Sequence, residues 1–436
     1  MPAVDGGGTA LLTDHYELTM LQAALADEAG QRRSVFEVFA RRLPDGRRYG
    51  VVGGTGRLLA DLERFRFDDD VLADLDRRRV VDGPTLGWLS DYRFTGDVWG
   101  YGEGECFFPY SPLLVVEASF AQAVILETLI LSVLNFDSAV ASAASRMTAA
   151  AGDRPCIEMG SRRTHEWAAV AAARAAYVAG FGSTSNLEAG RTYGVPTQGT
   201  SAHSFVLLHD TERDAFSAQV DSLGKGTTLL VDTYDVREAV ALGVEIAGPE
   251  LGAVRLDSGD LLAQAREVRA QLDELGASNT RIVVTSDLDE HAIAALAAAP
   301  VDAYGVGTSL VTGSGAPTAG LVYKLVARET RDGVMAAVAK KSKDKVSVGG
   351  RKYAMRRRTP DGVAEAEVIG LSAPPGDDGN DRPLLVPLVR EGEMVGREPL
   401  AVARERHAVS RAELPPTALQ MSRGEPAIPT VYEGES

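Results

Sequence analysis

The sequence predicts an α/β protein built around a parallel (β/α) barrel. From residue 155 onward, short apolar runs alternate with alanine-rich segments of helical periodicity, at intervals of about 20 to 30 residues. A strand followed by a helix, repeated in this way, is typical of a parallel sheet or barrel, and seven such units favour a closed barrel over an open sheet. The expected strands are 155–159, 178–182, 196–200, 227–232, 253–257, 281–285 and 303–307, and the expected helices between them are 167–176, 214–223, 236–242, 261–275 and 290–298.

The segments on either side of this region follow less regular patterns. We expect a disordered start at 1–9, an N-terminal α/β domain at 10–140, the barrel at 141–330, and a C-terminal segment at 331–436 with an extended tail from Pro415. In the N-terminal part we expect strand 34–40, short strands within 91–109, and helices at 14–29, 57–65, 117–135 and 138–150. Thr13 or Asp14 would cap the first helix. The basic run at 340–345 is interpreted as a solvated face.

Composition excludes several classes of function. With 436 residues and 45% hydrophobic content, the chain is long enough for one large domain and one or two smaller ones. The net charge of −16 argues against general binding to nucleic acids or anionic membranes, which needs a basic surface. Cys106 and Cys156 form no CxxC motif, which argues against a disulfide framework or a cysteine zinc site and suits a reducing cytoplasm.

We also expect a soluble, cytoplasmic chain. Residues 1–8 lack the basic region and apolar core of a signal peptide. The most apolar window, 113–136, contains Glu117 and Glu127, charges that a membrane span would rarely carry. We therefore expect this window to form a buried helix.

His203 lies in a turn of small residues, Gly199–Ser204, between an extended run and the start of a helix. Little side-chain bulk stands beside the imidazole, and the amino end of a helix attracts anions, so the position suits a phosphate. A histidine in a loop is more often structural, so the rest of the chain must decide between the two interpretations.

Polar side chains follow nearly every expected strand. In a (β/α) barrel the active site is assembled from residues at the carboxyl ends of the strands, so we expect these side chains to meet. Taken singly, the Asp, Ser, Thr and Asn residues are ordinary helix caps and the glycines are ordinary turn residues. The segments are 158–163, 182–186, 200–203, 232–235, 255–260, 286–289 and 305–308.

The combination of these residues indicates a phosphorylated sugar as substrate, handled without redox or thiol groups. Arg162 and Arg255 offer planar forks to a carboxylate or phosphate. Gly305, Gly307 and Thr308 would let backbone N–H groups approach a phosphate at a helix start. Carboxylates that could hold sugar hydroxyls or a Mg²⁺ ion stand at Asp232, Asp257 and Asp287.

Seven segments resemble, in the same order, those of the nicotinate phosphoribosyltransferase family. They are Thr13–Met20, Glu158–Arg163, Gly180–Asn186, Gly199–Ser204, Val231–Asp235, Arg255–Asp260 and Val322–Leu325. The resemblance runs from about residue 13 to residue 358 and is loose beyond residue 370. It implies a type II phosphoribosyltransferase fold: an irregular α/β barrel, an α/β domain in which the 331–436 segment packs on the N-terminal part, and a homodimer with shared active sites.

The resemblance implies that nicotinate and phosphoribosyl pyrophosphate are converted to nicotinate mononucleotide and pyrophosphate, in NAD salvage. It also implies that this is a ligase-type reaction, in which ATP hydrolysis is coupled through a phosphohistidine at the position of His203. Mg²⁺ on the leaving pyrophosphate would neutralise its charge without a proton donor. The ligands of the metal are left open.

The resemblance also implies roles for individual residues. Asp14 and Tyr16 would come from the partner subunit, with the tyrosine ring stacked on the pyridine; alternatively, Asp14 is a helix cap and Tyr16 a core residue. Ser185 suits the nicotinate anion, because the nicotinamide-using relative has there an aspartate that would repel a carboxylate. The expected site comprises catalytic His203, Asp257 and Arg255; substrate-binding Asp14, Tyr16, Arg162, Ser185, Ser204, Asp232 and Ser258; and phosphate-binding Ser286, Asp287, Gly305, Gly307 and Thr308.

Two alternative functions stay open at this point. One is a nicotinamide phosphoribosyltransferase, which assays with each base would separate from the nicotinate enzyme. The other is a non-catalytic barrel that binds phosphorylated metabolites. Loss of His203, Asp257 or Arg255 would mark that second alternative, and all three residues are present. The cysteine zinc site that some family members carry near the C-terminus is not expected here.

Overall fold

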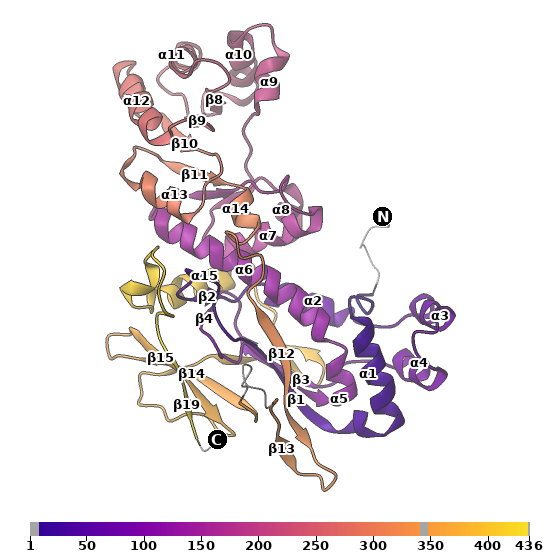
Figure 1. Cartoon of the computed structure of the whole chain (residues 1–436). Coiled ribbons are helices and arrows are strands. Elements are labelled where there is room, and N and C mark those ends of the chain that lie inside the picture. Colours follow the sequence, from indigo (N-terminus) through magenta and orange to yellow (C-terminus); the bar gives the residue numbers. More distant parts are fainter. Residues whose placement is uncertain (1–7, 341–347, 435–436) are drawn as a thin grey trace. The chain divides into compact units, whose positions relative to one another are not determined.

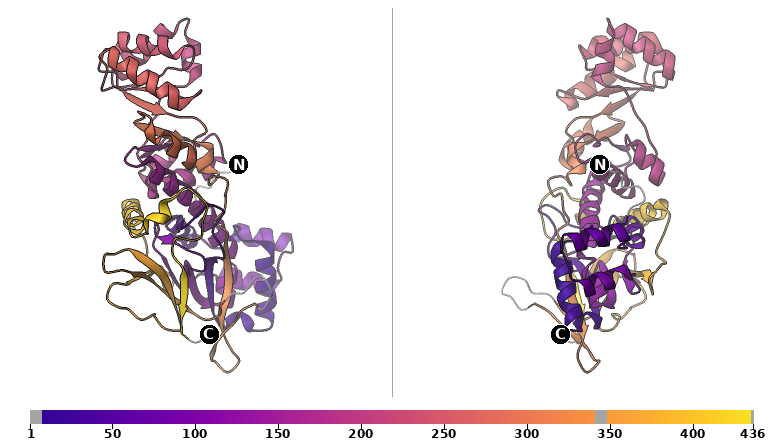
Figure 2. Two further views of the ribbon diagram at one scale, coloured as in Figure 1. Left: turned by 60° about the vertical axis from the view of Figure 1, so that its left-hand side comes forward. Right: turned by 90° about the vertical axis from the view of Figure 1, so that its right-hand side faces the viewer.

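The computed structural model describes residues 8–340 and 348–434, in two compact units. The terminal unit contains the described residues of Met1–Ala139 and Thr318–Ser436, and the central unit is Val140–Pro317. Within the terminal unit, the N-terminal part of the chain and the C-terminal part lie together, as the indigo and yellow segments of Figures 1 and 2 show. Because β12 lies in the terminal unit, the central unit ends at residue 317 and not at the expected 330.

The main sheet of the terminal unit has seven strands in the order β13-β12-β1-β5-β3-β17-β18. β1 (Arg33–Ala40) pairs antiparallel with β12 (Leu321–Glu329), and Phe36 of β1 stacks on Tyr323 of β12 with ring centroids 4.7 Å apart. This pairing explains why β12 joins the terminal unit. The other strands are β13 (Met335–Ala337), β5 (Leu114–Ser119), β3 (Asp97–Tyr101), β17 (Leu385–Arg390) and β18 (Glu393–Met394).

The remaining elements of the terminal unit surround this sheet. A second sheet has the order β16-β14-β15-β19, and β2 pairs with β4. The helices are α1 (His15–Ala26), η1 (Ala29–Gln31), α2 (Thr55–Glu63), α3 (Asp69–Arg77), α4 (Gly83–Ser90), α5 (Phe120–Val124), α15 (Leu400–Ala412) and η3 (Pro416–Leu419). The strands are β2 (Gly50–Val51), β4 (Cys106–Phe107), β14 (Lys352–Arg358), β15 (Ala364–Leu371), β16 (Arg382–Pro383) and β19 (Thr430–Glu433).

Two expectations for the terminal unit were wrong. The expected helix 117–135 begins later, because residues up to Ser119 pair in β5 and the Ser119 hydroxyl then caps α5. Thr9 is not disordered: its side chain is buried and donates to the Asp61 carbonyl at 2.6 Å, whereas residues 1–7 lie outside the described chain. The expected extended tail contains a strand, because β19 pairs in parallel with β15. The basic run at 340–345 lies, apart from Lys340, outside the described residues.

One long apolar helical stretch, Phe120–Ala151, passes the length and hydropathy test for a membrane span, with a mean hydropathy of 1.7. It contains α5 and α6 (Glu127–Ala151), so the expected break between helices near residue 136 is absent within these described residues. Of the apolar window, 67% is buried inside the protein. The burial agrees with the expected buried helix.

The central unit contains a six-stranded parallel sheet in the order β7-β6-β11-β10-β9-β8 (Figure 1). The sheet is curled, so the predicted α/β class with an irregular barrel-like sheet is confirmed. Within the described residues it is a half-barrel with β7 and β8 at its edges, and not the closed barrel that the repeated units favoured. The strands are β6 (Cys156–Glu158), β7 (Ser183–Thr184), β8 (Thr228–Leu230), β9 (Ala253–Leu256), β10 (Arg281–Val284) and β11 (Ala303–Val306). The helices are α7 (Glu166–Val178), α8 (Leu187–Tyr193), α9 (His203–Leu208), α10 (Glu212–Leu223), α11 (Val236–Ala247), α12 (Leu261–Glu274), α13 (Glu290–Ala295), η2 (Leu296–Ala298) and α14 (Thr308–Val311).

Two expected strands of this sheet were wrong. Residues 196–200 form one isolated bridge, Thr184 to Thr197, because Pro196 has no N–H to donate and β7 is only two residues long. Residues 178–182 are not a strand either, since the alanine-rich helix α7 continues to Val178 and pairing begins at Ser183. The other five expected strands are present with boundaries that differ by at most two residues.

Candidate active site

A cavity of about 530 Å³ lies at the carboxyl ends of the strands in the central unit. Its walls come from the residues after β6, β7, β9, β10 and β11 and from the segment that precedes α9. The lining residues are Met159, Ser161, Arg162, Arg163, Ser185, Gln198, Gly199, Thr200, Ser201, Ala202, His203, Arg255, Asp257, Thr285, Ser286, Asp287, Gly305, Gly307 and Thr308. The expectation that the polar residues at the carboxyl ends of the strands meet in one place is therefore correct, and they line a cavity.

His203 is the first residue of α9, and its side chain is 41% exposed. Nδ1 lies 3.1 Å from the Thr233 hydroxyl, and Nε2 lies 4.0 Å from a carboxylate oxygen of Asp257. The two nitrogens thus face different groups, one fixed by a hydrogen bond and one beside a carboxylate at the cavity. The geometry leaves the imidazole accessible to a ligand.

The carboxylates at the strand ends divide into two kinds. Asp235 and Asp260 cap α11 and α12, accepting hydrogen bonds from the first-turn N–H groups of Glu238 and Ala263. Asp289 caps α13 in the same way. In each strand-end segment the second aspartate is therefore the helix cap. The first aspartates, Asp232, Asp257 and Asp287, are not caps and remain candidates for the site.

Asp232 and Asp257 are joined by hydrogen bonds. One oxygen of Asp232 accepts from the Asp257 backbone N–H at 3.0 Å and from the Ser258 hydroxyl at 2.7 Å. The Thr285 hydroxyl donates to Asp257. The other oxygen of Asp232 is buried without a hydrogen-bond partner among the described residues. A buried carboxylate oxygen without a partner can bind a cation or accept a hydrogen bond from a hydroxyl group of a ligand.

Arg255 holds the segment before His203. Its Nη1 donates to the Ser201 carbonyl at 3.1 Å and to the Thr200 hydroxyl. Burial lowers the pKa of Arg255, the Asp257 and Asp232 carboxylates raise it, and the Arg162 cation lowers it further. Because a guanidinium stays charged in proteins, this cation gains from any anion that enters the cavity.

The loops after β6 and β7 bear Arg162 and Ser185, which are both exposed to the cavity. The Ser185 N–H donates to the Glu158 carbonyl at 2.8 Å, so the two strand ends are tied through the backbone. A guanidinium and a hydroxyl on adjacent loops can accept the carboxylate of a small aromatic acid.

The loops after β10 and β11 form the side of the cavity expected to hold phosphate. Ser286 has a φ of 134°, a strained backbone conformation for a residue with a side chain. At Gly305 a Cβ would lie 2.5 Å from the Thr285 side chain, so a glycine is required there. Gly307 and Thr308 follow directly and lead into α14, and Asp287 completes this wall.

Asp14 and Tyr16 lie in the terminal unit, at the start of α1. Asp14 occupies the N-cap position of α1, although its side chain makes no capping hydrogen bond within the described structure. Tyr16 is 44% exposed, so it is not a core residue. Burial and the Glu127 and Glu17 carboxylates raise the pKa of Tyr16. The phenol therefore stays neutral and can stack on an aromatic ligand.

Three other expected site residues lie outside the lining of the cavity. Asp232 accepts from the Asp257 N–H, Ser258 donates to Asp232, and Ser204 is exposed beside His203. Sequence reasoning assigned no role to Thr285 and Thr233, which hydrogen-bond Asp257 and His203. Thr233 lies in the strand-end segment 232–235 and Thr285 ends the expected strand 281–285, so their position was the available signal. Thr200 had the same signal from segment 200–203, whereas Gln198, inside the expected strand 196–200, had none.

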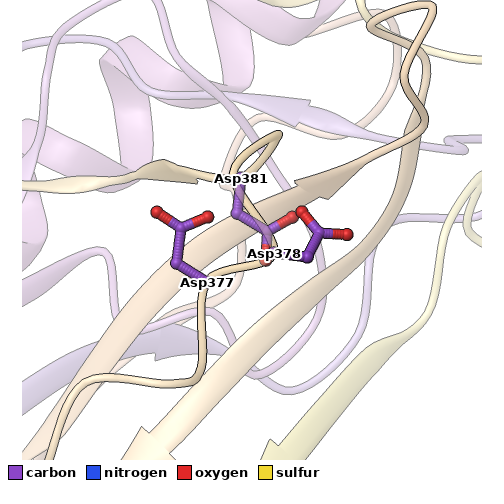
Figure 3. Close-up of side chains that lie close together, drawn as sticks. All are labelled: Asp377, Asp378 and Asp381. Carbon is purple, nitrogen blue, oxygen red and sulfur yellow. The ribbon is translucent and has the colours of Figure 1, made fainter.

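One acidic cluster stands apart from this site. Asp377, Asp378 and Asp381 gather within one loop of the terminal unit (Figure 3). The Gly379 N–H donates to Asp377 at 2.7 Å, and Asp381 accepts from Arg357 at 3.3 Å. These contacts explain the cluster as a turn anchored by an arginine.

Comparison with known proteins agrees with the fold. The family description "nicotinate phosphoribosyltransferase (NAPRTase) N-terminal domain" matches residues 11–135. Nicotinate phosphoribosyltransferase pncB1 of Mycobacterium tuberculosis is 58% identical over 429 residues, which is 96% of this chain and 94% of that protein. A nicotinate phosphoribosyltransferase of Bacillus subtilis is 37% identical over 359 residues, or 80% and 73% of the two chains.

Solved structures place the chain in a class. The crystal structure of human nicotinic acid phosphoribosyltransferase aligns with a TM-score of 0.81 and 26% identity over 97% of this chain and 98% of that chain. The curled parallel sheet, with cations and glycines at its strand ends, is thus the fold of a phosphoribosyltransferase. With the relatives above, the chain belongs to the nicotinate phosphoribosyltransferase family.

Proposed function

We propose that this protein transfers the phosphoribosyl group of phosphoribosyl pyrophosphate to nicotinate, forming nicotinate mononucleotide and pyrophosphate in NAD salvage. The pyridine nitrogen attacks the anomeric carbon, and the electron pair of the breaking C–O bond leaves with pyrophosphate. The observation that carries the proposal is that His203, Arg255 and Asp257 line the same cavity. The chain that forms this cavity belongs to the nicotinate phosphoribosyltransferase family.

The base is proposed to lie between the loops after β6 and β7. Arg162 would bind the nicotinate carboxylate and Ser185 would donate to it, which favours the acid over the amide. Tyr16 and Asp14 would complete the pocket from a partner subunit in a homodimer. Their exposure in a separate unit of this chain is compatible with that role.

The phosphates are proposed to bind at the other wall, where Gly305, Gly307 and Thr308 present backbone N–H groups and Ser286 and Asp287 line the opening. Ser204 and Ser258 would offer hydroxyls to the substrate. In this proposal uncharged donors would meet the charged ends of phosphoribosyl pyrophosphate, and Arg255 would supply the local cation.

Mg²⁺ fits the residues present. The unpartnered oxygen of Asp232 and the adjacent Asp257 carboxylate are hard oxygen ligands, which this ion prefers together with substrate phosphates. Asp232 and Asp257 would hold the ion, which when bound neutralises the charge of the leaving pyrophosphate. Asp232 also keeps Ser258 and the Asp257 backbone in place.

ATP hydrolysis is proposed to be coupled through His203, which makes the protein an ATP-coupled ligase. The imidazole would take the γ-phosphoryl group of ATP, releasing ADP, and water would later remove that group as phosphate. The accessibility of the ring and its position beside Asp257 support this role. His203 does not make the glycosidic bond in this scheme. We further propose that the enzyme acts in the cytoplasm, which its buried thiols suit.

The test uses γ-labelled ATP with Mg²⁺, and product formation from nicotinate and phosphoribosyl pyrophosphate. We expect an acid-labile, base-stable phosphoprotein in the wild type. In His203→Ala we expect a folded protein without label that retains at most slow transfer independent of ATP. Unaltered ATP stimulation of the variant would refute the phosphohistidine, and absence of nicotinate mononucleotide with the wild type would refute the reaction itself.

A further inference from the structure

We propose that Glu158 is a positioning residue for the base pocket, acting through a closed ring of hydrogen bonds that joins the loop bearing Arg162 to the loop bearing Ser185. The inference rests on the proposed function, because it takes these two side chains to contact nicotinate. Glu158 itself lies behind the cavity and is not among the residues that line it.

The ring has five members. One carboxylate oxygen of Glu158 accepts from the Gly160 N–H, and the other accepts from the Thr184 hydroxyl. The Thr184 oxygen in turn accepts from the Asn186 N–H at 2.9 Å. The Asn186 side-chain amide donates to the Ser161 hydroxyl at 3.0 Å, and Ser161 is the chain neighbour of Gly160, which closes the ring.

Because Glu158 is buried, its carboxyl group depends on the hydrogen bonds of the ring. Glu158 is 0% exposed, and within the described chain no lysine or arginine forms an ion pair with it. Burial raises the pKa of its carboxyl group, whereas the hydrogen bonds from Thr184 and Gly160 lower it. A carboxyl group in such surroundings is costly unless its acceptors are used, and here each oxygen has a donor from a different loop. A hydrophobic residue of the same size would fill the space but could not connect the loops.

The ring acts directly on the pocket because its members adjoin the binding residues in the chain. Ser161 precedes Arg162, and Thr184 precedes Ser185. The β6 loop also has little freedom to move elsewhere, since a Cβ on Gly160 would lie 2.3 Å from a Val311 methyl group. Breaking the Asn186–Ser161 contact therefore changes the separation of the guanidinium and the hydroxyl, and with it the affinity for the base. The Met159 N–H keeps its hydrogen bond to the Val306 carbonyl, at 2.8 Å, which joins the β6 loop to the phosphate wall.

The decisive variant is Asn186→Ser. Serine keeps the capping oxygen that Asn186 supplies to the Ala189 N–H of α8, but it is too short to reach Ser161. We expect the KM for nicotinate to rise about tenfold, which corresponds to the loss of one partly buried hydrogen bond. The KM for phosphoribosyl pyrophosphate and kcat should stay within about twofold of the wild type. Glu158→Gln, which removes one acceptor, should give the same selective effect. If Glu158→Gln does not fold, Asn186→Ser decides alone.

Asp235→Ser is the matched control, because it changes the equivalent cap of α11 outside the ring and should leave both KM values unchanged. Binding of nicotinate is measured in parallel by calorimetry. Equal changes in the KM values of both substrates, or none in Asn186→Ser, would overturn the positioning role while leaving the reaction intact. A wild type that neither binds nor converts nicotinate would instead overturn the proposed function, and the positioning role with it.

Discussion

Replacing Arg255 by lysine tests how the segment before His203 is held. The guanidinium bridges the Ser201 carbonyl, at 3.1 Å, and the Thr200 hydroxyl from its terminal nitrogen Nη1. A lysine side chain is one bond shorter, so its ammonium group does not reach both groups from the same backbone position. Hydrogen bonds to a charged group contribute roughly 1.5–3 kcal/mol each, and the lower end suits a side chain that is only half-buried. Loss of both therefore amounts to about 3 kcal/mol, or about a hundredfold in kcat/KM.

The assay is steady-state formation of nicotinate mononucleotide, with urea unfolding of the same preparations. Arg269→Lys is the control, because Arg269 also donates two hydrogen bonds to a neighbouring segment, to the carbonyls of Thr280 and Ala277 at 2.7 and 3.1 Å, but lies on α12 outside the cavity. The Arg269→Lys variant should have a lower free energy of unfolding than the wild type and an unchanged kcat/KM. An Arg255→Lys enzyme with kcat/KM within twofold of the wild type, or a loss no larger than that of the control, would refute the reasoning.

Three further perturbations have defined outcomes. Ser286→Gly should raise the free energy of unfolding by about 1 kcal/mol in urea titrations, because it relieves a φ of 134°; a loss of stability would contradict the strain. Ser185→Asp should raise the KM for nicotinate by at least about tenfold and shift preference toward nicotinamide, because a second carboxylate repels the acid; an unchanged preference would count against the base pocket. His407 is buried, and burial with the Arg411 cation lowers its pKa to about 3. Between pH 6.5 and 3 the unfolded chain then binds the extra proton, so stability falls as pH falls, by up to about 1.4 kcal/mol per pH unit. His407→Gln should remove this part of the slope of unfolding free energy against pH, and an unchanged slope would exclude His407 as its source.

The site could be predicted from the sequence because parallel strands place their carboxyl ends at one edge. Arg255 and Gly305 lie near the carboxyl ends of β9 and β11, and Asp257 directly follows β9; the apolar runs of these strands were clear, and all three residues line the cavity. The rule could not separate the aspartates that cap helices from those that do not, since Asp232 and Asp235 look alike in sequence. Only the hydrogen bonds of the folded chain show that Asp235 is the cap.

The failures have local causes. Residues 117–119 were assigned to a helix because a short apolar run does not by itself distinguish a strand from a buried helix. In the fold they pair with β1, a contact across the sheet that local pattern cannot show. The run at 196–200 has strand-like composition, but with a proline at its start and a two-residue neighbour it finds a single bridge. In both segments the secondary structure depends on pairing with another part of the chain, which the local sequence pattern does not show.

The measurement that tests the central claim most directly is turnover of nicotinate and nicotinamide, side by side, by the purified protein with phosphoribosyl pyrophosphate, ATP and Mg²⁺. The account predicts nicotinate mononucleotide and pyrophosphate as products, with a clear preference in kcat/KM for the acid, because Arg162 and Ser185 stand at the base pocket. A preference for nicotinamide, or no phosphoribosyl transfer to either base, would contradict it.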